Sequence, residues 1–79
     1  MAETRSALRH RVLKAGTIEF GGGAIDCVVR NLSSFGAALE VSSQLGIPDK
    51  FMLAMPGDGL RLHCEVMWRN VYRIGVAFG

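Results

Sequence analysis

Two stretches of the sequence carry polar or charged side chains that could bind a ligand. The first is a short polar stretch over residues 31–36, Asn-Leu-Ser-Ser-Phe-Gly. Asn31 supplies an amide that can meet a base edge, and Ser33 supplies a hydroxyl for a phosphate or a base. Gly36 lets the backbone pass close to a ligand or adopt a positive φ. Asn, Ser and Gly are also the residues that ordinary turns favour. Taken alone, this stretch is therefore most simply a structural turn.

A second stretch, residues 1–11, is basic. Arg5 and Arg9 are four residues apart, so both side chains point to the same side of a helical turn or of an extended strand. Guanidinium forks bind phosphate oxygens in parallel pairs and also read the O6 and N7 atoms of guanine. Arg11 and Lys14 are further candidate phosphate contacts. A solvated basic tail is the plain alternative, but together the two stretches predict one composite site for a nucleotide that carries phosphates and guanine.

The elements that must position these residues fit in one small domain. The chain has 79 residues, of which 49% are hydrophobic and 20% are charged, a composition typical of a folded chain. No apolar run approaches the roughly 20 residues that span a bilayer, and the N-terminus has no apolar signal region, so we expect a cytoplasmic protein without membrane insertion. A net charge of only +2 argues against a nucleic acid polymer as partner.

Short apolar runs separated by glycine-rich or proline-rich turns predict six strands and no helix long enough for a crossover. We expect these strands over residues 12–20, 24–30, 36–41, 51–55, 60–69 and 72–78. Consecutive short strands favour an antiparallel sheet, and closing it into a barrel hides its edges. The predicted fold is an all-β, six-stranded antiparallel β-barrel over residues 12–79, with a flexible arm over residues 1–11 and no long C-terminal helix.

Alternation along the strands predicts which side chains face the core. Leu60 and Trp68 share the inward phase of the longest strand, and Tyr72 that of the last one. The strand over residues 51–55 is apolar on both faces, as a strand covered on two sides would be. The two cysteines, Cys27 and Cys64, lie in apolar strands and are predicted to be reduced, buried residues rather than zinc ligands.

Catalytic groups are not assembled in the sequence. The acids are scattered singly, and Ser33 and Ser34 have no neighbouring His and acid pair. His10 belongs to the basic arm, and His63 is expected on the solvent-exposed face of its strand. The sequence therefore favours a binding module that is not an enzyme and that holds neither a metal nor a resident cofactor.

The order and spacing of these motifs resemble the PilZ domain, a family of small bacterial β-barrels. Its RxxxR motif is matched by Arg-Ser-Ala-Leu-Arg from Arg5 to Arg9, and its [DN]xSxxG motif by Asn31, Ser33 and Gly36. The segment 68–78 is similar to the last two strands of the family. The resemblance implies a cytoplasmic signal-transduction module that binds the second messenger cyclic di-GMP between the arm and the turn. It also implies that the arm folds over the ligand and that binding is passed to a partner protein.

Two alternatives remain open at this point. One is a PilZ-like protein-interaction module that has lost nucleotide binding, because Ser6 follows Arg5 where family members often have paired arginines. The other is a small barrel that binds single-stranded nucleic acid, for which few exposed aromatic residues are expected. The first hypothesis, a non-catalytic cyclic di-GMP receptor, accounts for the largest number of motifs.

Overall fold

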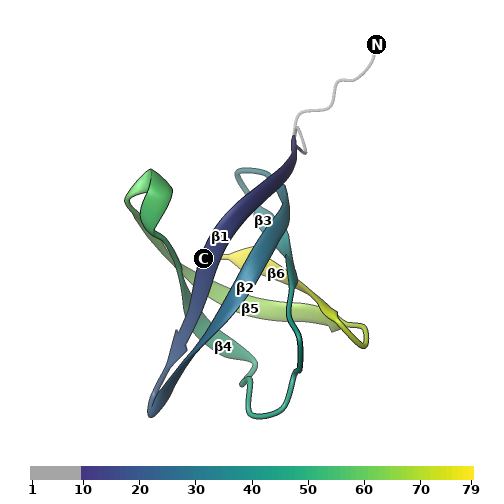
Figure 1. Cartoon of the computed structure of the whole chain (residues 1–79). Coiled ribbons are helices and arrows are strands. Elements are labelled where there is room, and N and C mark those ends of the chain that lie inside the picture. The colour runs from purple at the N-terminus through teal and green to yellow at the C-terminus, as the bar shows by residue number, and fades with distance from the viewer. Residues whose placement is uncertain (1–9) are drawn as a thin grey trace.

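The fold was analysed in a computed structural model, which describes residues 10–79 (Figure 1). These residues form six β-strands and one short 3-10 helix: β1 (His10–Phe20), β2 (Gly23–Leu32), β3 (Gly36–Glu40), β4 (Lys50–Met55), η1 (Pro56–Asp58), β5 (Leu60–Arg69) and β6 (Arg73–Phe78). All strand pairs are antiparallel, and the sheet closes in the order β1-β2-β3-β6-β5-β4. The predicted all-β, six-stranded antiparallel barrel is therefore confirmed.

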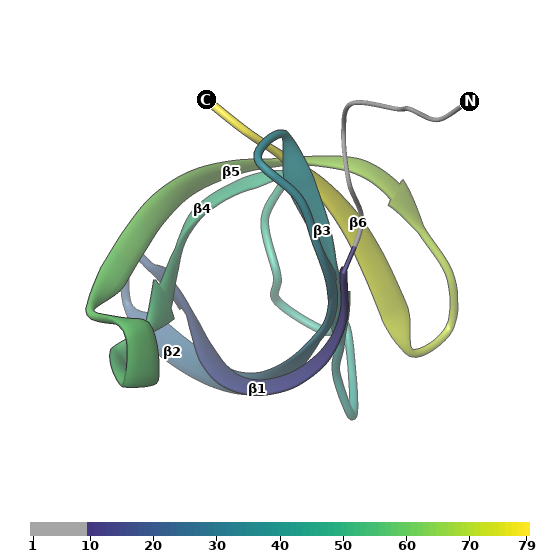
Figure 2. The same ribbon diagram turned by 90° about the horizontal axis from the view of Figure 1, so that it is seen from above.

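The view from above shows the strands arranged in a ring (Figure 2). Buried apolar side chains form a single core cluster inside it. The barrel closes where β4 pairs with β1, with Ile18 opposite Leu53. Alternate residues of each strand point inward, as the two-residue period requires. The largest fully buried side chains are Ile18, Val29, Leu39, Leu53, Met55 and Ile74. Both cysteines are free and buried in this core, as predicted.

Three β-bulges interrupt the alternation, in β1 between Arg11 and Lys14, in β2 between Val29 and Asn31, and in β5 between Val66 and Trp68. A bulge inserts one extra residue, so the side chains beyond it change face. Val66 packs against the core, whereas Trp68 lies on the outer face and is 46% exposed. The prediction of an inward Trp68 is wrong, because it assumed unbroken alternation along β5.

Strand boundaries differ from the predictions near the polar stretch. β2 continues to Leu32, so Asn31 is a strand residue and the turn is confined to residues 33–35. β1 begins at His10 rather than Val12, so Arg11 lies in the barrel sheet. Arg5 and Arg9 lie outside the described residues.

Three predictions of burial are also wrong. Leu60 and Tyr72 are 43% and 59% exposed, because each lies at or beside the end of a strand, where the barrel wall gives way to solvent. In β4, Phe51, Leu53 and Met55 are buried, whereas Met52 and Ala54 on the outer face are only half-buried. No second layer covers that face among residues 10–79, so β4 is covered on one side.

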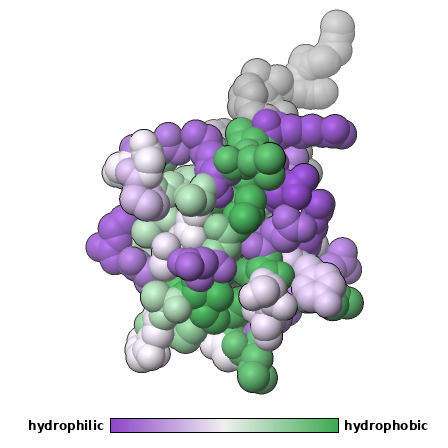
Figure 3. All heavy atoms as spheres, viewed as in Figure 1, coloured by the Kyte–Doolittle hydropathy of each residue, from purple (hydrophilic) through white to green (hydrophobic). Residues whose placement is uncertain are grey.

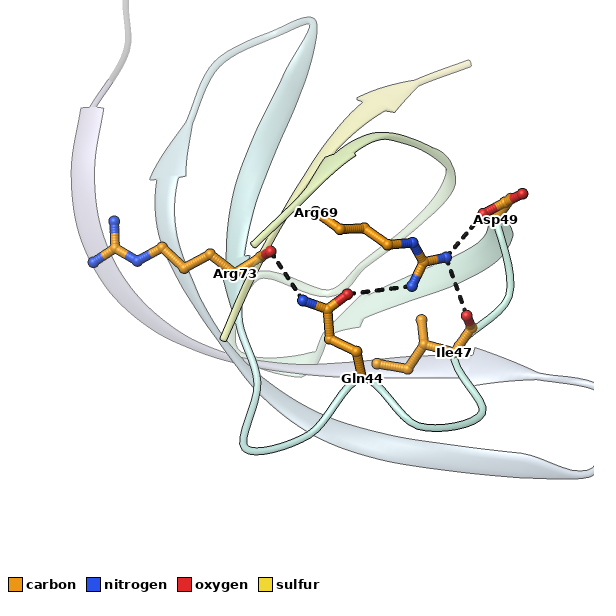
Figure 4. Close-up of polar contacts among 5 residues, drawn as sticks. All are labelled: Gln44, Ile47, Asp49, Arg69 and Arg73. Atoms are coloured by element: carbon orange, nitrogen blue, oxygen red, sulfur yellow. Dashed lines mark hydrogen bonds and ion pairs between the residues drawn. The ribbon is translucent and has the colours of Figure 1, made fainter. Parts of the chain in front are cut away.

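The connection over residues 41–49 crosses the end of the barrel and is fastened to the β5–β6 turn (Figure 4). The Arg69 guanidinium donates to Asp49 Oδ1 at 2.8 Å, to the carbonyl of Ile47 at 3.1 Å and to Gln44 Oε1 at 3.3 Å. The Gln44 amide in turn donates to the carbonyl oxygens of Asn70 and Arg73. These contacts fix the β5–β6 turn, and with it the end of β5 that carries Trp68.

Candidate functional site

One row of outward-facing residues crosses five neighbouring strands of the barrel. Arg11 on β1 lies opposite Asn31 on β2, and Asn31 lies opposite Ala38 on β3. Ala38 lies opposite Gly75 on β6, which in turn lies opposite Trp68 on β5. Because the two middle residues are small, the row forms a trough. It has a cation and an amide at one end and an indole at the other.

From Asn31 to Trp68, the row lines a groove of about 410 Å³, and Arg11 lies outside this lining. The lining includes the predicted residues Asn31, Ser33 and Gly36, so the structure brings all three together. At the far end, the Trp68 indole occupies the space above Gly75, where any β-carbon would collide with it. The bulges in β2 and β5 flank the groove, and the bulge in β5 turns Trp68 toward it.

Ser33 shapes the turn at the edge of this groove. Its Oγ accepts hydrogen bonds from the backbone amides of Phe35 at 3.1 Å and Gly36 at 3.2 Å. The Ser33 amide donates to the carbonyl of Gly36 at 2.9 Å, and the Phe78 amide donates to the carbonyl of Phe35 at 2.8 Å. The backbone of Phe35 is therefore held on both sides, and the Ser33 hydroxyl acts first as a brace for the turn.

Gly36 serves close packing rather than an unusual backbone conformation. The glycines with positive φ are Gly22, Gly46 and Gly59. A β-carbon at Gly36 would collide with the carbonyl oxygen of Val76, where β3 approaches β6. Gly36 does not adopt the positive φ that the sequence suggested, and the group that approaches it closely is the backbone of β6.

Large apolar side chains on the groove wall were missed by sequence reasoning. Phe35 is 66% exposed and Met67 is 64% exposed, and both line the groove with Trp68. Phe35 occupies a variable position of the turn motif, and the outward turn of Trp68 depends on a bulge that alternation does not reveal. The only usable sequence signal was Gly75, whose missing side chain leaves room for a ring on the neighbouring strand.

A second cleft, of about 620 Å³, adjoins the basic end of the row and shares Asn31 with the groove. Arg11, Arg30 and Arg73 line it. In the space-filling view, hydrophilic side chains gather beside the upper half of β1, over β2 and β3 (Figure 3). Lys14 is placed elsewhere, since its Nζ pairs with Asp58 of η1 at 3.0 Å and it lines neither cavity.

The two buried thiols, those of Cys27 and Cys64, have low reactivity at neutral pH. Burial raises the pKa of both Cys27 and Cys64 to about 11; the charges of Asp26 and Cys64 add to the effect at Cys27, and a backbone hydrogen bond at Leu53 opposes it at Cys64. Both thiols are therefore protonated at neutral pH and are poor nucleophiles. Within residues 10–79, no group of three or more His, Cys, Asp or Glu side chains is arranged to hold a metal ion.

The described residues form a small closed antiparallel barrel with a groove on its outer face, which is lined by the Trp68 indole at one end and by the Asn31 amide at the other. The chain matches the PilZ domain over residues 3–79 and therefore belongs to the PilZ family, as the sequence motifs predicted. No curated protein and no solved structure matched it. PilZ domains form a family of cyclic di-GMP-binding modules that are generally non-catalytic. The part of the chain that the structure describes has no helix with the length and hydropathy of a membrane span.

Proposed function

We propose that this chain is a non-catalytic cyclic di-GMP receptor that binds the dinucleotide in the outer groove, between the N-terminal arginines and the 31–36 turn, and passes binding to a partner protein. The observation that carries the proposal is the cross-strand row from Arg11 to Trp68. It offers a cation, an amide, a floor of small residues and an aromatic ring in one line. A nucleotide needs these groups for its phosphates, its base edge and its base face.

Each group has a distinct task in this proposal. Trp68 receives the face of a guanine, and the Asn31 amide meets a base edge. Arg5, Arg9 and Arg11 contact phosphates with their guanidinium forks. Ser33 and Gly36 act mainly by shaping the turn and by allowing β3 to approach β6. Lys14 is given no ligand contact in this proposal, because it lines neither the groove nor the second cleft.

The chain contains a single tryptophan, so the emission of Trp68 reports directly on the groove. Titration of the whole chain with cyclic di-GMP is expected to quench this emission. Isothermal titration calorimetry in the same buffer should give a matching dissociation constant. Cyclic di-AMP, which has the same backbone but a different base edge, tests whether binding depends on guanine.

Replacement of Trp68 by alanine should weaken binding by about 1–3 kcal/mol, the usual contribution of one stacked base. This corresponds to a loss of about 5- to 150-fold in affinity, measured by calorimetry. Asn31→Ala and Arg9→Ala should also weaken binding, because each removes a proposed polar contact. Tyr72→Ala is the matched control, since Tyr72 is an exposed aromatic residue that does not line the groove.

The use of the Ser33 hydroxyl inside the turn favours one second candidate, a protein-interaction module that no longer binds nucleotide. In that case wild-type protein should show neither heat nor quenching at millimolar cyclic di-GMP. Such a result would refute the receptor proposal. Binding that survives Trp68→Ala, Asn31→Ala and Arg9→Ala unchanged would instead place the ligand outside this groove.

A further inference from the structure

We infer that Arg30 and Arg73, which belong to neither family motif, form a phosphate-binding subsite beside the groove, and that Glu40 is the resident anion that the phosphate displaces. This inference rests on the proposed function, since it assigns one of the ligand's phosphodiester groups to the second cleft. It adds two arginines to the site. It also adds a carboxylate, that of Glu40, which competes with the ligand for the guanidinium of Arg30.

The position of the cleft supports a role in the same binding event. It adjoins the groove through Asn31, which lines both cavities. The bulge between Val29 and Asn31 places Arg30 next to Asn31 on the outer face of β2. A dinucleotide with its base on Trp68 and its sugar along the row from Ala38 to Asn31 would therefore bring a phosphate to the mouth of this cleft.

Arg73 reaches the cleft from a different strand. Its backbone carbonyl accepts a hydrogen bond from the Gln44 amide at 3.3 Å, and its side chain extends in the opposite direction, away from the Gln44 and Arg69 contacts (Figure 4). The contacts to the 41–49 connection thus hold the β6 end of the cleft while the Arg73 guanidinium remains directed into it. The backbone that carries this donor is therefore held in place before a ligand binds, which lowers the entropy cost of binding.

Glu40 lies between these two arginines. Arg30 Nη1 donates to Glu40 Oε1 at 2.9 Å, and Arg73 lies directly opposite Glu40 in the β3–β6 register. The side chains of Arg30 and Glu40 are 37% and 38% exposed, so their ion pair is weak and easily exchanged. A phosphodiester offers several acceptor oxygens and can engage both guanidinium groups, whereas Glu40 is paired with Arg30.

The test measures the dissociation constant of cyclic di-GMP for the whole chain by Trp68 quenching and calorimetry. Arg30→Gln and Arg73→Gln should each weaken binding by about 10- to 100-fold, as expected for a lost hydrogen bond between charged groups. Glu40→Gln should strengthen binding by about two- to fivefold, because the competing ion pair is removed. The affinity of the wild-type chain should fall more steeply with added salt than that of either arginine variant.

A second ion pair gives the matched control. Arg61 donates to Glu19 at 2.6 Å, and neither residue lines the groove or the cleft. Arg61→Gln and Glu19→Gln should leave the affinity within about twofold of wild type, within the range for surface charges away from the ligand. Arg30→Lys and Arg73→Lys keep the charge and separate its effect from that of the guanidinium fork, while circular dichroism verifies that each variant is folded.

The outcomes separate the two hypotheses. Wild-type protein that does not bind cyclic di-GMP would overturn the proposed function and this inference together. Wild-type binding with Arg30→Gln and Arg73→Gln no weaker than Arg61→Gln would overturn the subsite alone. A loss of affinity in Glu40→Gln would show that Glu40 positions Arg30 rather than competing with the phosphate, and would overturn the displacement.

Discussion

Gly36→Ala tests whether the turn motif acts through backbone packing. The substitution adds a single methyl group at the start of β3. That methyl group would collide with the carbonyl oxygen of Val76, and Gly36 is paired with Ala77 in the same β3–β6 ladder. A carbonyl oxygen in a closed sheet cannot rotate away as a side chain can. The strands must therefore separate locally, and the ladder hydrogen bonds near this pair must lengthen.

The size of the effect follows from two opposing contributions. An extra methyl group forced into a packed site costs about 1–3 kcal/mol. Replacement of glycine by alanine returns about 0.4–1 kcal/mol by restricting the unfolded chain. The cost is expected in the upper part of its range, because the obstacle is backbone. The net loss of unfolding free energy is therefore about 1–2 kcal/mol. For a chain of 79 residues this lowers the melting temperature by about 4–16 °C.

Thermal unfolding followed by circular dichroism measures this change without any ligand. Gly21→Ala is the matched control, because Gly21 has no atom within 4 Å of an added β-carbon and no positive φ. It should leave the unfolding free energy within about 0.5 kcal/mol of wild type. If Gly36→Ala melted at the same temperature as Gly21→Ala, the close approach of β3 to β6 could not be what requires glycine at this position.

Two further predictions concern the groove and the core. Gly75→Ala should change the emission of Trp68 and weaken cyclic di-GMP binding, while lowering the melting temperature less than Gly36→Ala does, because the obstacle is a side chain that can move; unchanged emission would contradict this. The thiol pKa values, raised by burial from about 9 to about 11, mean that the folded state holds these protons more tightly than the unfolded chain does. The stabilisation is complete below pH 9 and is lost as the pH rises through 11, by up to about 3 kcal/mol per thiol. Urea titrations should show this slope in wild type but not in Cys27→Ala/Cys64→Ala.

The strand pattern and the family motifs made the fold predictable from the sequence. The apolar strand pattern identified Cys27 and Cys64 as buried residues, and glycine-rich turns separated the strands. Strand ends were less predictable. The alternation continued to Leu60 and Tyr72, where the barrel no longer provides an apolar partner to cover them.

The candidate site was predictable only in part. The motif residues Asn31, Ser33 and Gly36 do line one groove. Trp68 was misplaced because a bulge leaves no local mark in the sequence of β5, and its presence is decided by the register against β6. Arg30 and Arg73 meet in the second cleft although they are 43 positions apart in the chain, a proximity that depends on β3 lying between their strands.

The structure divides the turn motif into two kinds of position. Ser33 and Gly36 determine the backbone structure. Ser33 fixes the turn with hydrogen bonds, and Gly36 allows β6 to pack closely against β3. Asn31, on the outer face beyond a bulge, is the motif residue whose side chain lies in the row that crosses the sheet. A chain can therefore keep the backbone positions for stability even after losing its ligand, so their presence is weak support for binding. The side chains of the row, with Arg11 and Trp68 at its two ends, make no comparable contribution to the turn or to strand packing, so the proposed cyclic di-GMP binding is expected to depend on them.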